Sequence, residues 1–250
     1  MSTSRSYFSL ISLNSKLYAI GGLNSKPDKR INSVESYDTQ TNTWKSVSPM
    51  NYIRSSFDSA IIDNTIYVCG GDNNEPLKSC EYYTPNTDEW YFTASMRTER
   101  DGLALVLHEG CLYAIGGKNR NVFINSMEKF DTKTKQWSTN ANMNSSRSLF
   151  GSASFMGKIY VCGGLGTSDG KSCETYDPQT NQWTPIGSMK TRRNDFKLIV
   201  FNNNLYALGG NSDDNRLTDT IEIYDYYEDK WGYTTSLPQN LGAYGATVAN

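Results

Sequence analysis

The hexapeptide LYAIGG at residues 17–22 decides the fold, because the chain repeats it four more times with small changes. The related hexapeptides begin at Ile66, Leu112, Ile159 and Leu205. The first glycines of the five pairs lie 46 to 49 residues apart. Self-similarity at such a period indicates a tandem repeat architecture.

Each repeat continues with a glutamate and, nine positions later, a tryptophan: Glu35 and Trp44, Glu81 and Trp90, Glu128 and Trp137, Glu174 and Trp183, Glu222 and Trp231. An arginine stands 16 residues before each glycine pair: Arg5, Arg54, Arg100, Arg147 and Arg193. Only the stretch between the glycines and the glutamate varies in length. The spacing therefore predicts a rigid scaffold with one adjustable loop per repeat.

The segments within a repeat predict four short strands. The first two are almost continuously apolar, which is typical of strands covered on both faces. The third alternates, as in SVESYD at 33–38, and a polar turn such as TQTN at 39–42 leads to the strand that carries the tryptophan. One such sheet cannot bury both faces, whereas radial stacking of copies can. We predict an all-β propeller of five blades, whose glycine pairs allow positive φ or close backbone approach.

Composition excludes several classes of partner. The formal net charge of −2 and a charged fraction of 20% provide no basic surface for nucleic acid. No apolar run approaches the roughly 18 residues of a membrane span, and the start lacks a signal-peptide pattern. We expect a cytoplasmic protein that contacts neither nucleic acid nor membrane.

The cysteines and the single histidine predict neither a metal site nor catalysis. Cys69 and Cys80 are 11 residues apart, as are Cys162 and Cys173, on neighbouring strands. We expect reduced core thiols, with disulfides as the alternative. His108 is expected in a turn, aligned with Asn14, Asp63, Met156 and Asn203. With one histidine, we expect no cofactor and no metal.

The glycine pair, the Glu-x-Tyr-Asp element, the tryptophan and the Met-x-x-x-Arg junction together resemble kelch repeats. Their order is most similar to the kelch domain of kelch-like adaptor proteins. The resemblance implies a module that holds a substrate for a cullin-3 ubiquitin ligase, through BTB and BACK domains that these 250 residues do not contain. It also implies a six-bladed ring.

The expected organisation is one propeller domain over 1–250. Its repeats span approximately 1–53, 54–99, 100–146, 147–192 and 193–240, and 241–250 is a partial sixth repeat containing only an innermost strand. Met1 lies four residues before Arg5, like Met50 before Arg54. We therefore expect an incomplete six-bladed ring, with three strands of a sixth blade upstream of Met1. The alternative is a closed five-bladed ring with a redundant tail.

The five arginines and five glutamates, present one to one, predict repeated buried pairs in the scaffold. The resemblance also places the arginines, and the residue after each, at the rim of the central channel, where ligands bind. The loops after the glycine pairs add variable polar residues. The expected partner-binding residues are Arg5, Ser6, Arg54, Ser55, Arg100, Asp101, Arg147, Ser148, Arg193, Asn194, Asn73, Asn119 and Asp213.

The expected function is therefore non-enzymatic binding of a protein or peptide at the channel rim. A cytoskeletal kelch protein that binds actin is the alternative. An enzyme similar to the kelch-like sialic acid epimerases is a third interpretation, but the rim positions offer no evident acid–base partner for the arginines.

Overall fold

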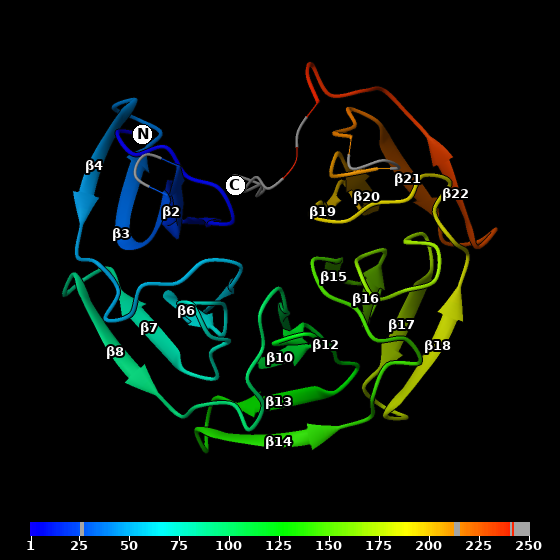
Figure 1. Ribbon diagram of the computed structural model, residues 1–250, viewed down its shortest axis with the longest axis horizontal. Helices are drawn as coiled ribbons and strands as arrows, with labels where there is room; N and C mark the ends of the chain where they lie inside the picture. The colour runs from blue at the N-terminus through cyan, green and yellow to red at the C-terminus, as the bar shows by residue number, and fades with distance from the viewer. Residues whose placement is uncertain (26–27, 213–215, 241, 243–250) are drawn as a thin grey trace.

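The computed structural model describes the whole chain except residues 26–27, 213–215, 241 and 243–250. The described residues form strands and turns, and contain no helix. Five antiparallel four-stranded sheets stand around a central channel (Figure 1). The predicted all-β propeller with five blades is therefore confirmed.

Each blade is built from strands that follow one another outward from the channel. Blade 1 contains β1 (Ser9–Leu13), β2 (Lys16–Ser25), β3 (Asp28–Asp38) and β4 (Thr43–Val47). Blade 2 contains β5 (Asp58–Ile62), β6 (Thr65–Cys69), β7 (Cys80–Thr84) and β8 (Glu89–Thr93). Blade 3 contains β9 (Ala104–His108), β10 (Cys111–Ile115), β13 (Met127–Asp131) and β14 (Gln136–Asn140).

The last two blades repeat this order. Blade 4 contains β15 (Gly151–Phe155), β16 (Lys158–Cys162), β17 (Cys173–Asp177) and β18 (Gln182–Ile186). Blade 5 contains β19 (Lys197–Phe201), β20 (Asn204–Leu208), β21 (Ile221–Asp225) and β22 (Lys230–Tyr233). Two loops form hairpins of their own: β2 and β3 pair as far as Ser25 and Asp28, and blade 3 adds β11 (Lys118–Asn119) and β12 (Val122–Phe123).

The core consists of four apolar layers, one between each pair of successive blades. The layer between blades 1 and 2, for example, joins Tyr18 and Ile20 to Ile66, Tyr83 and Trp90. Layers of the same kind join blades 2 and 3, 3 and 4, and 4 and 5. Hydrophobic burial between blades, rather than within one sheet, therefore holds the propeller together.

The ring of blades is open between blade 5 and blade 1 (Figure 1). The innermost strands touch in the order β1, β5, β9, β15 and β19, and the described residues show no comparable contact between β19 and β1. A closed five-bladed ring is therefore not what the fold shows. The predicted innermost strand at 241–250 lies outside the described residues, apart from Gly242.

The glycine pairs occupy the position that the sequence predicted for them. Gly70 has a φ of +69°, and a Cβ there would lie 2.7 Å from Arg100 O in the next blade. Gly71 has a φ of +90°. The pair thus combines a left-handed backbone with close approach between blades, which only glycine accommodates without strain.

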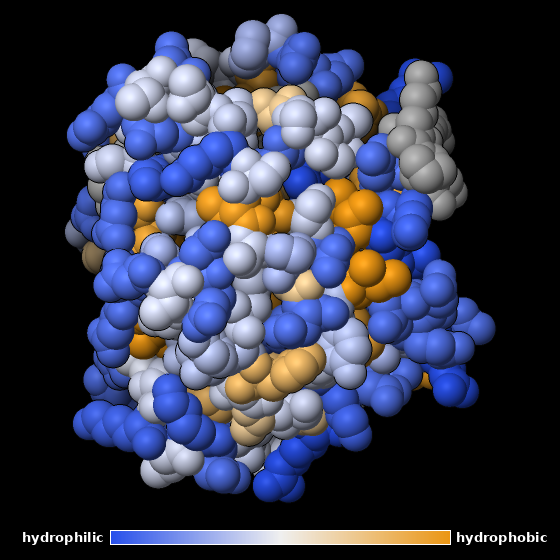
Figure 2. Space-filling view, turned by 90° about the vertical axis from the view of Figure 1, so that its left-hand side faces the viewer, coloured by the Kyte–Doolittle hydropathy of each residue, from blue (hydrophilic) through white to orange (hydrophobic). Residues whose placement is uncertain are grey.

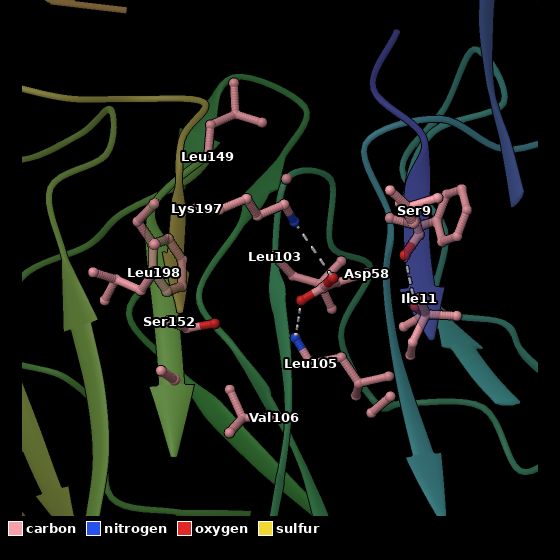
Figure 3. Close-up of a pocket in the computed structure, with 18 of the residues that line it drawn as sticks. Ser9, Ile11, Asp58, Leu103, Leu105, Val106, Leu149, Ser152, Lys197 and Leu198 are labelled. Atoms are coloured by element: carbon pink, nitrogen blue, oxygen red, sulfur yellow. Dashed lines mark hydrogen bonds and ion pairs between the residues drawn. The ribbon is translucent and has the colours of Figure 1, made fainter. Parts of the chain in front are cut away.

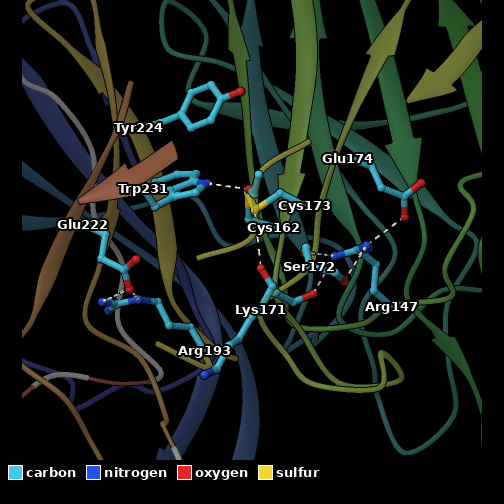
Figure 4. Close-up of a disulfide and its surroundings, with 12 residues drawn as sticks. Arg147, Cys162, Lys171, Ser172, Cys173, Glu174, Arg193, Glu222, Tyr224 and Trp231 are labelled. Carbon is cyan, nitrogen blue, oxygen red and sulfur yellow. Dashed lines mark hydrogen bonds and ion pairs between the residues drawn. A yellow bond between two sulfur atoms is a disulfide. The ribbon is translucent and has the colours of Figure 1, made fainter. Parts of the chain in front are cut away.

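Two disulfides join the second and third strands of blades 2 and 4, so the prediction of reduced thiols is wrong. Cys69 lies directly opposite Cys80, with their Cα atoms 4.2 Å apart, and Cys162 lies opposite Cys173 at 4.1 Å. This close antiparallel pairing puts the two sulfur atoms within bonding reach. Figure 4 shows the second disulfide beside Trp231. Cys111 is a free thiol.

The outer side of the ring at β4 and β8 is mostly hydrophilic, with apolar residues in separate patches (Figure 2). The described part of the chain has no helix of the length and apolarity that a membrane crossing requires.

Candidate partner-binding face

The five frame arginines, those that precede each glycine pair by 16 residues, lie inside the protein. Arg147 Nη1 donates to Gly163 O and Ser172 O, both at 2.9 Å, and Arg147 Nη2 donates to Glu174 Oε1 at 2.8 Å (Figure 4). The corresponding pairs are Arg5–Glu35, Arg54–Glu81, Arg100–Glu128 and Arg193–Glu222. The predicted arginine–glutamate pairing is present in all five blades.

Each glutamate also holds the chain segment that enters its blade. Glu174 accepts hydrogen bonds from the backbone N–H groups of Asn144 and Ser145, at 2.7 and 3.1 Å. Burial lowers the pKa of the Arg147 guanidinium, and the hydrogen bond and charge of Glu174 oppose this shift. Because all five arginine side chains are buried and their terminal nitrogens bond to the paired glutamate and to backbone carbonyls, we assign them to the scaffold.

The residue after each frame arginine lies at the rim and pairs through its backbone with the residue after a glycine pair. Ser148 N donates to Leu165 O at 2.9 Å, and Leu165 N donates to Ser148 O at 2.8 Å. Ser6, Ser55, Asp101 and Asn194 form the same bridge with Leu23, Asp72, Lys118 and Asn211. These pairs fix the junctions and the variable loops on one face of the propeller, which we call the loop face.

A ring of left-handed residues follows at the mouth of the channel. Tyr7, Ser56, Leu149 and Asp195 have φ values of 51° to 54°, and Gly102 has 63°. Backbone N–H groups of this ring donate to the carbonyl of the preceding blade: Ser56 to Tyr7, Gly102 to Ser56, Leu149 to Gly102 and Asp195 to Leu149. The mouth is therefore held by main-chain bonds that run from blade to blade.

Below this mouth lies a cavity of about 360 Å³ lined by the innermost strands of all five blades (Figure 3). Asp58 accepts a hydrogen bond from Leu105 N at 2.9 Å, and its other carboxylate oxygen lies 4.0 Å from Lys197 Nζ across the channel. The remaining lining is mostly small or apolar, as at Ser152 and Val106. The channel thus offers one ion pair and a further carboxylate, Asp195, in a wall that is otherwise uncharged.

The loops of the first three blades interlock on the loop face. Arg30, on the β2–β3 hairpin of blade 1, pairs with Asp72 and donates to Asn74 Oδ1 at 3.0 Å, both in the loop of blade 2. Arg120, on the hairpin of blade 3, lies 3.4 Å from Glu75 in the same loop. The blade 2 loop is therefore held from both sides by cations of its neighbours.

A second cavity of about 400 Å³ opens between the blade 2 loop and the blade 3 hairpin. We call it the rim cleft, and it is lined by Asp72, Asn74, Glu75, Pro76, Asp101, Lys118, Arg120 and Asn121. Two predicted residues, Asn73 and Asn119, are direct chain neighbours of this lining, and Asp101 is part of it. Asp213 lies outside the described residues.

Asp101 is the most perturbed carboxylate of the rim cleft. Burial raises its pKa, and the negative charge of Asp72 raises it further, whereas Lys118 and Arg30 act in the opposite direction. Lys118 Nζ lies 4.0 Å from Asp101 Oδ2. A partly desolvated carboxylate with incomplete pairing gains from a donor supplied by a ligand, so Asp101 is suited to hydrogen bonding with a peptide.

The other predicted rim residues differ in exposure. Ser55, Ser148 and Asn194 are buried, and Ser148 Oγ donates to Asp101 O at 3.2 Å. Ser6 is half-buried. Among the predicted rim residues that the structure describes, the accessible ones outside the buried arginines therefore belong to blades 1 to 3: Ser6, Asn73, Asp101 and Asn119. Sequence reasoning missed the contribution of Arg30, which only the length of its hairpin loop could have suggested.

His108 is a buried residue at the end of β9, so the prediction that it lies in a turn is wrong. It is aligned with Leu13, Ile62, Phe155 and Phe201, one position before the turn. It is 4% exposed, and its Nδ1 lies 2.8 Å from Ser154 Oγ. Among the described residues, no group of three or more His, Cys, Asp or Glu side chains could hold a metal ion.

Residues 7–210 match the KLHDC2/KLHL20/DRC7 Kelch-repeats domain, and residues 192–238 match the Kelch motif. The solved structure of YjhT is similar in fold, with a TM-score of 0.81, 14% sequence identity and coverage of 92% of this chain and 84% of that one.

Two relatives are similar in sequence over part of their length. Kelch-like protein 40 of Xenopus laevis is 30% identical over 173 residues, which cover 68% of this chain and 28% of that protein. Kelch repeat and BTB domain-containing protein 1 of cowpox virus (strain Brighton Red) is 31% identical over 153 residues, covering 59% of this chain and 27% of that protein. The matched region is thus less than a third of each relative. Repeat, fold and family match agree, and the chain belongs to the kelch-repeat family.

Proposed function

We propose that this chain is a protein-binding kelch module that holds a peptide segment of its partner in the rim cleft. The observation that carries the proposal is the set of partly buried charges of both signs around that cleft. Asp72 pairs with Arg30 of the neighbouring blade, Asp101 lies near Lys118 of its own blade, and all three groups are only partly exposed to water. Preorganised polar groups of this kind discriminate between peptides by complementary hydrogen bonds and charges.

The contact surface proposed here consists of Asp101, Asn73, Asn119, Ser6 and the cations Arg30, Lys118 and Arg120. The neighbouring channel mouth can receive an adjoining side chain of the same peptide, because its cavity combines small and apolar groups from all five blades with Asp58, Asp195 and Lys197. Ser55, Ser148 and Asn194 support this surface through their backbone pairs with the loops.

We further propose that the captured protein is a substrate of a cullin-3 ubiquitin ligase, reached through BTB and BACK domains. Support comes from the similarity to Kelch-like protein 40 and to a viral protein whose name includes a BTB domain. A recognition module of this type needs no catalytic group, only a surface that varies on a constant scaffold.

The binding proposal is tested by affinity capture with the purified chain and quantitative mass spectrometry. Arg120→Glu and Asp101→Ala should each reduce capture of a specific partner at least tenfold, with the melting temperature unchanged. Lys45→Glu, on the outer strand β4, is the matched control and should capture as the wild type does. Equal capture by all variants would reject the rim cleft as the site.

The ligase proposal is tested with the chain fused behind a BTB–BACK pair. With cullin-3, the wild-type fusion should ubiquitinate the captured partner, and the Arg120→Glu fusion should not. If the partner binds but is never modified, the ligase proposal fails while the binding proposal stands. Actin in the captured fraction would instead support the cytoskeletal alternative.

A further inference from the structure

The outermost strand of blade 2 differs from those of the other blades. Its two exposed central residues, Tyr91 and Phe92, are 39% and 55% exposed. At the same two positions the other outer strands carry Lys45 and Ser46, Ser138 and Thr139, Thr184 and Pro185, and Gly232 and Tyr233. Charged residues and proline protect an exposed edge strand from pairing with other chains, and β8 has neither at these positions.

Tyr91 is the exposed end of a row of stacked rings. The ring centres of Tyr67 and Tyr82 are 5.6 Å apart, and those of Tyr82 and Tyr91 are 5.3 Å apart, with interplanar angles of 29° and 25°. The rings follow three adjacent strands, β6, β7 and β8, whose spacing they nearly match. An aromatic residue on a fifth strand, directly opposite Tyr91, would continue the row.

The other face of β8 carries a second aromatic pair. Phe92 packs against Tyr52, with ring centres 5.3 Å apart and an interplanar angle of 57°, and Tyr52 is 44% exposed. The free edge of β8 is therefore flanked by exposed rings on both faces of the sheet. This arrangement favours a partner strand that also presents aromatic residues at alternating positions.

We infer that β8 pairs antiparallel with β8 of a second copy of this chain. A two-fold axis at Tyr91 places the two Tyr91 rings opposite each other and extends the row to six tyrosines. The same register sets Trp90 opposite Phe92, and Glu89 opposite Thr93, so that no like charges face each other. A second copy thus supplies the strand that this edge fits, and the small net charge of −2 opposes association only weakly.

One existing contact must change when the strands pair. Asn51 Nδ2 lies 3.3 Å from Trp90 O, at the edge of β8, and 2.8 Å from Glu81 Oε2. The bond to Glu81 is the shorter one and is kept when Trp90 O turns to the partner strand. The contact area of a single strand pair is small, so we expect a reversible dimer with a dissociation constant of about micromolar or weaker.

Sedimentation velocity over a concentration series tests the inference with the chain itself. The wild type should shift from monomer to dimer, and Tyr91→Lys should weaken the dimer at least tenfold. Ser138→Lys, at the equivalent position of β14, is the matched control and should dimerise as the wild type does. A wild type that stays monomeric into the high micromolar range would overturn the inference, as would a Tyr91→Lys dimer of unchanged affinity.

Hydrogen exchange locates the interface independently of any substitution. Backbone amides of β8 should exchange at least fivefold more slowly at high protein concentration than at low concentration, while those of β14 and β18 should not change. Concentration-dependent protection that appears in β2 or β20 but not in β8 would assign the association to the open ring instead and contradict the inference.

Discussion

Blade 1 and blade 2 carry the same residues in two different environments. Blade 2 packs against the preceding blade, blade 1, and in blade 2 Trp90 is 8% exposed and Tyr83 is 2% exposed. Blade 1 faces the opening of the ring, and its equivalents Trp44 and Tyr37 are only half-buried. The preceding blade, not the sheet to which the tryptophan belongs, therefore provides most of its burial.

The polar contacts differ in the same way. Trp90 Nε1 donates to Ser48 O in blade 1 at 2.9 Å, and Trp137, Trp183 and Trp231 make the same bond to the blade before them. Asn42 of blade 1 accepts the hydroxyl of Tyr37, as Asp88 of blade 2 accepts that of Tyr83, but Asp88 also accepts from Ser48 N of the preceding blade. Each interface between successive blades therefore has an apolar layer and a matching set of hydrogen bonds. The open side of blade 1 carries one half of such an interface.

The largest expected effect distinguishes the two tryptophans. Trp90→Ala should lower the free energy of unfolding by about 3 to 5 kcal/mol, because it empties a buried layer and removes a bond between blades. Trp44→Ala should cost about 1 to 2 kcal/mol, since this ring is already partly hydrated. Urea unfolding followed by circular dichroism measures both, and equal losses would show that the preceding blade contributes little.

A smaller effect is expected at a turn residue that accepts hydrogen bonds both from its own blade and from the preceding blade. Asp229 Oδ1 accepts from Gly187 N of the preceding blade at 2.7 Å and from the Tyr224 hydroxyl at 2.6 Å. Asp229→Ala should cost about 1 to 3 kcal/mol, because the Gly187 N–H and the part-buried Tyr224 hydroxyl lose a charged acceptor. Asn42→Ala, the open-side equivalent, should cost about 0.5 to 1 kcal/mol. Melting curves of the two variants would separate these values.

The smallest effect at neutral pH concerns Glu35, the frame glutamate next to the opening. Burial raises the pKa of Glu35, but hydrogen bonds from Ser2, Arg5 and Thr3 outweigh it and lower that pKa to about 2. A carboxylate with a depressed pKa contributes stability above its unfolded pKa, near 4.5, which is lost as the pH falls towards 2.

The wild type should therefore lose stability between about pH 4.5 and pH 2, and Glu35→Gln should show a shallower loss over this window. The comparison uses the slope of stability against pH rather than the absolute stability, because Glu35→Gln also loses the pairing with Arg5 at neutral pH. Parallel slopes in a series of thermal melts would show that Glu35 titrates normally in the folded chain.

Much of the fold follows from spacing in the sequence. The constant 16 residues from arginine to glycine and nine from glutamate to tryptophan predicted the blades and the Arg147–Glu174 type of pair. The blades and these pairs both depend on local geometry that is the same in every repeat. Constant spacing in the sequence therefore predicts them. The structure also shows an opening between blades 5 and 1, whereas the three strands predicted upstream of Met1 stay a prediction.

The wrong or missing predictions concern residues whose environment depends on contacts in space more than on position in the repeat. Cys69 and Cys80 are bonded because strand register puts them directly opposite, and a one-residue slip would have separated their sulfur atoms. The alignment of the repeats placed His108 one position too late, in the turn, whereas the residue is the buried last position of β9. The rim cleft joins Asp101 and Arg120 of blade 3 to the blade 2 loop, which Arg30 of blade 1 holds from the other side, and loop conformations of that kind have no periodic signal.

The main-chain hydrogen bonds that encircle the channel mouth join neighbouring blades through backbone groups, and these bonds do not depend on the side chains at Tyr7 and Leu149. Substitution at these points can therefore accumulate during evolution without loosening the assembly. Related chains can then diverge in what they recognise while inheriting the same backbone, and differences between paralogues should be greatest around this opening.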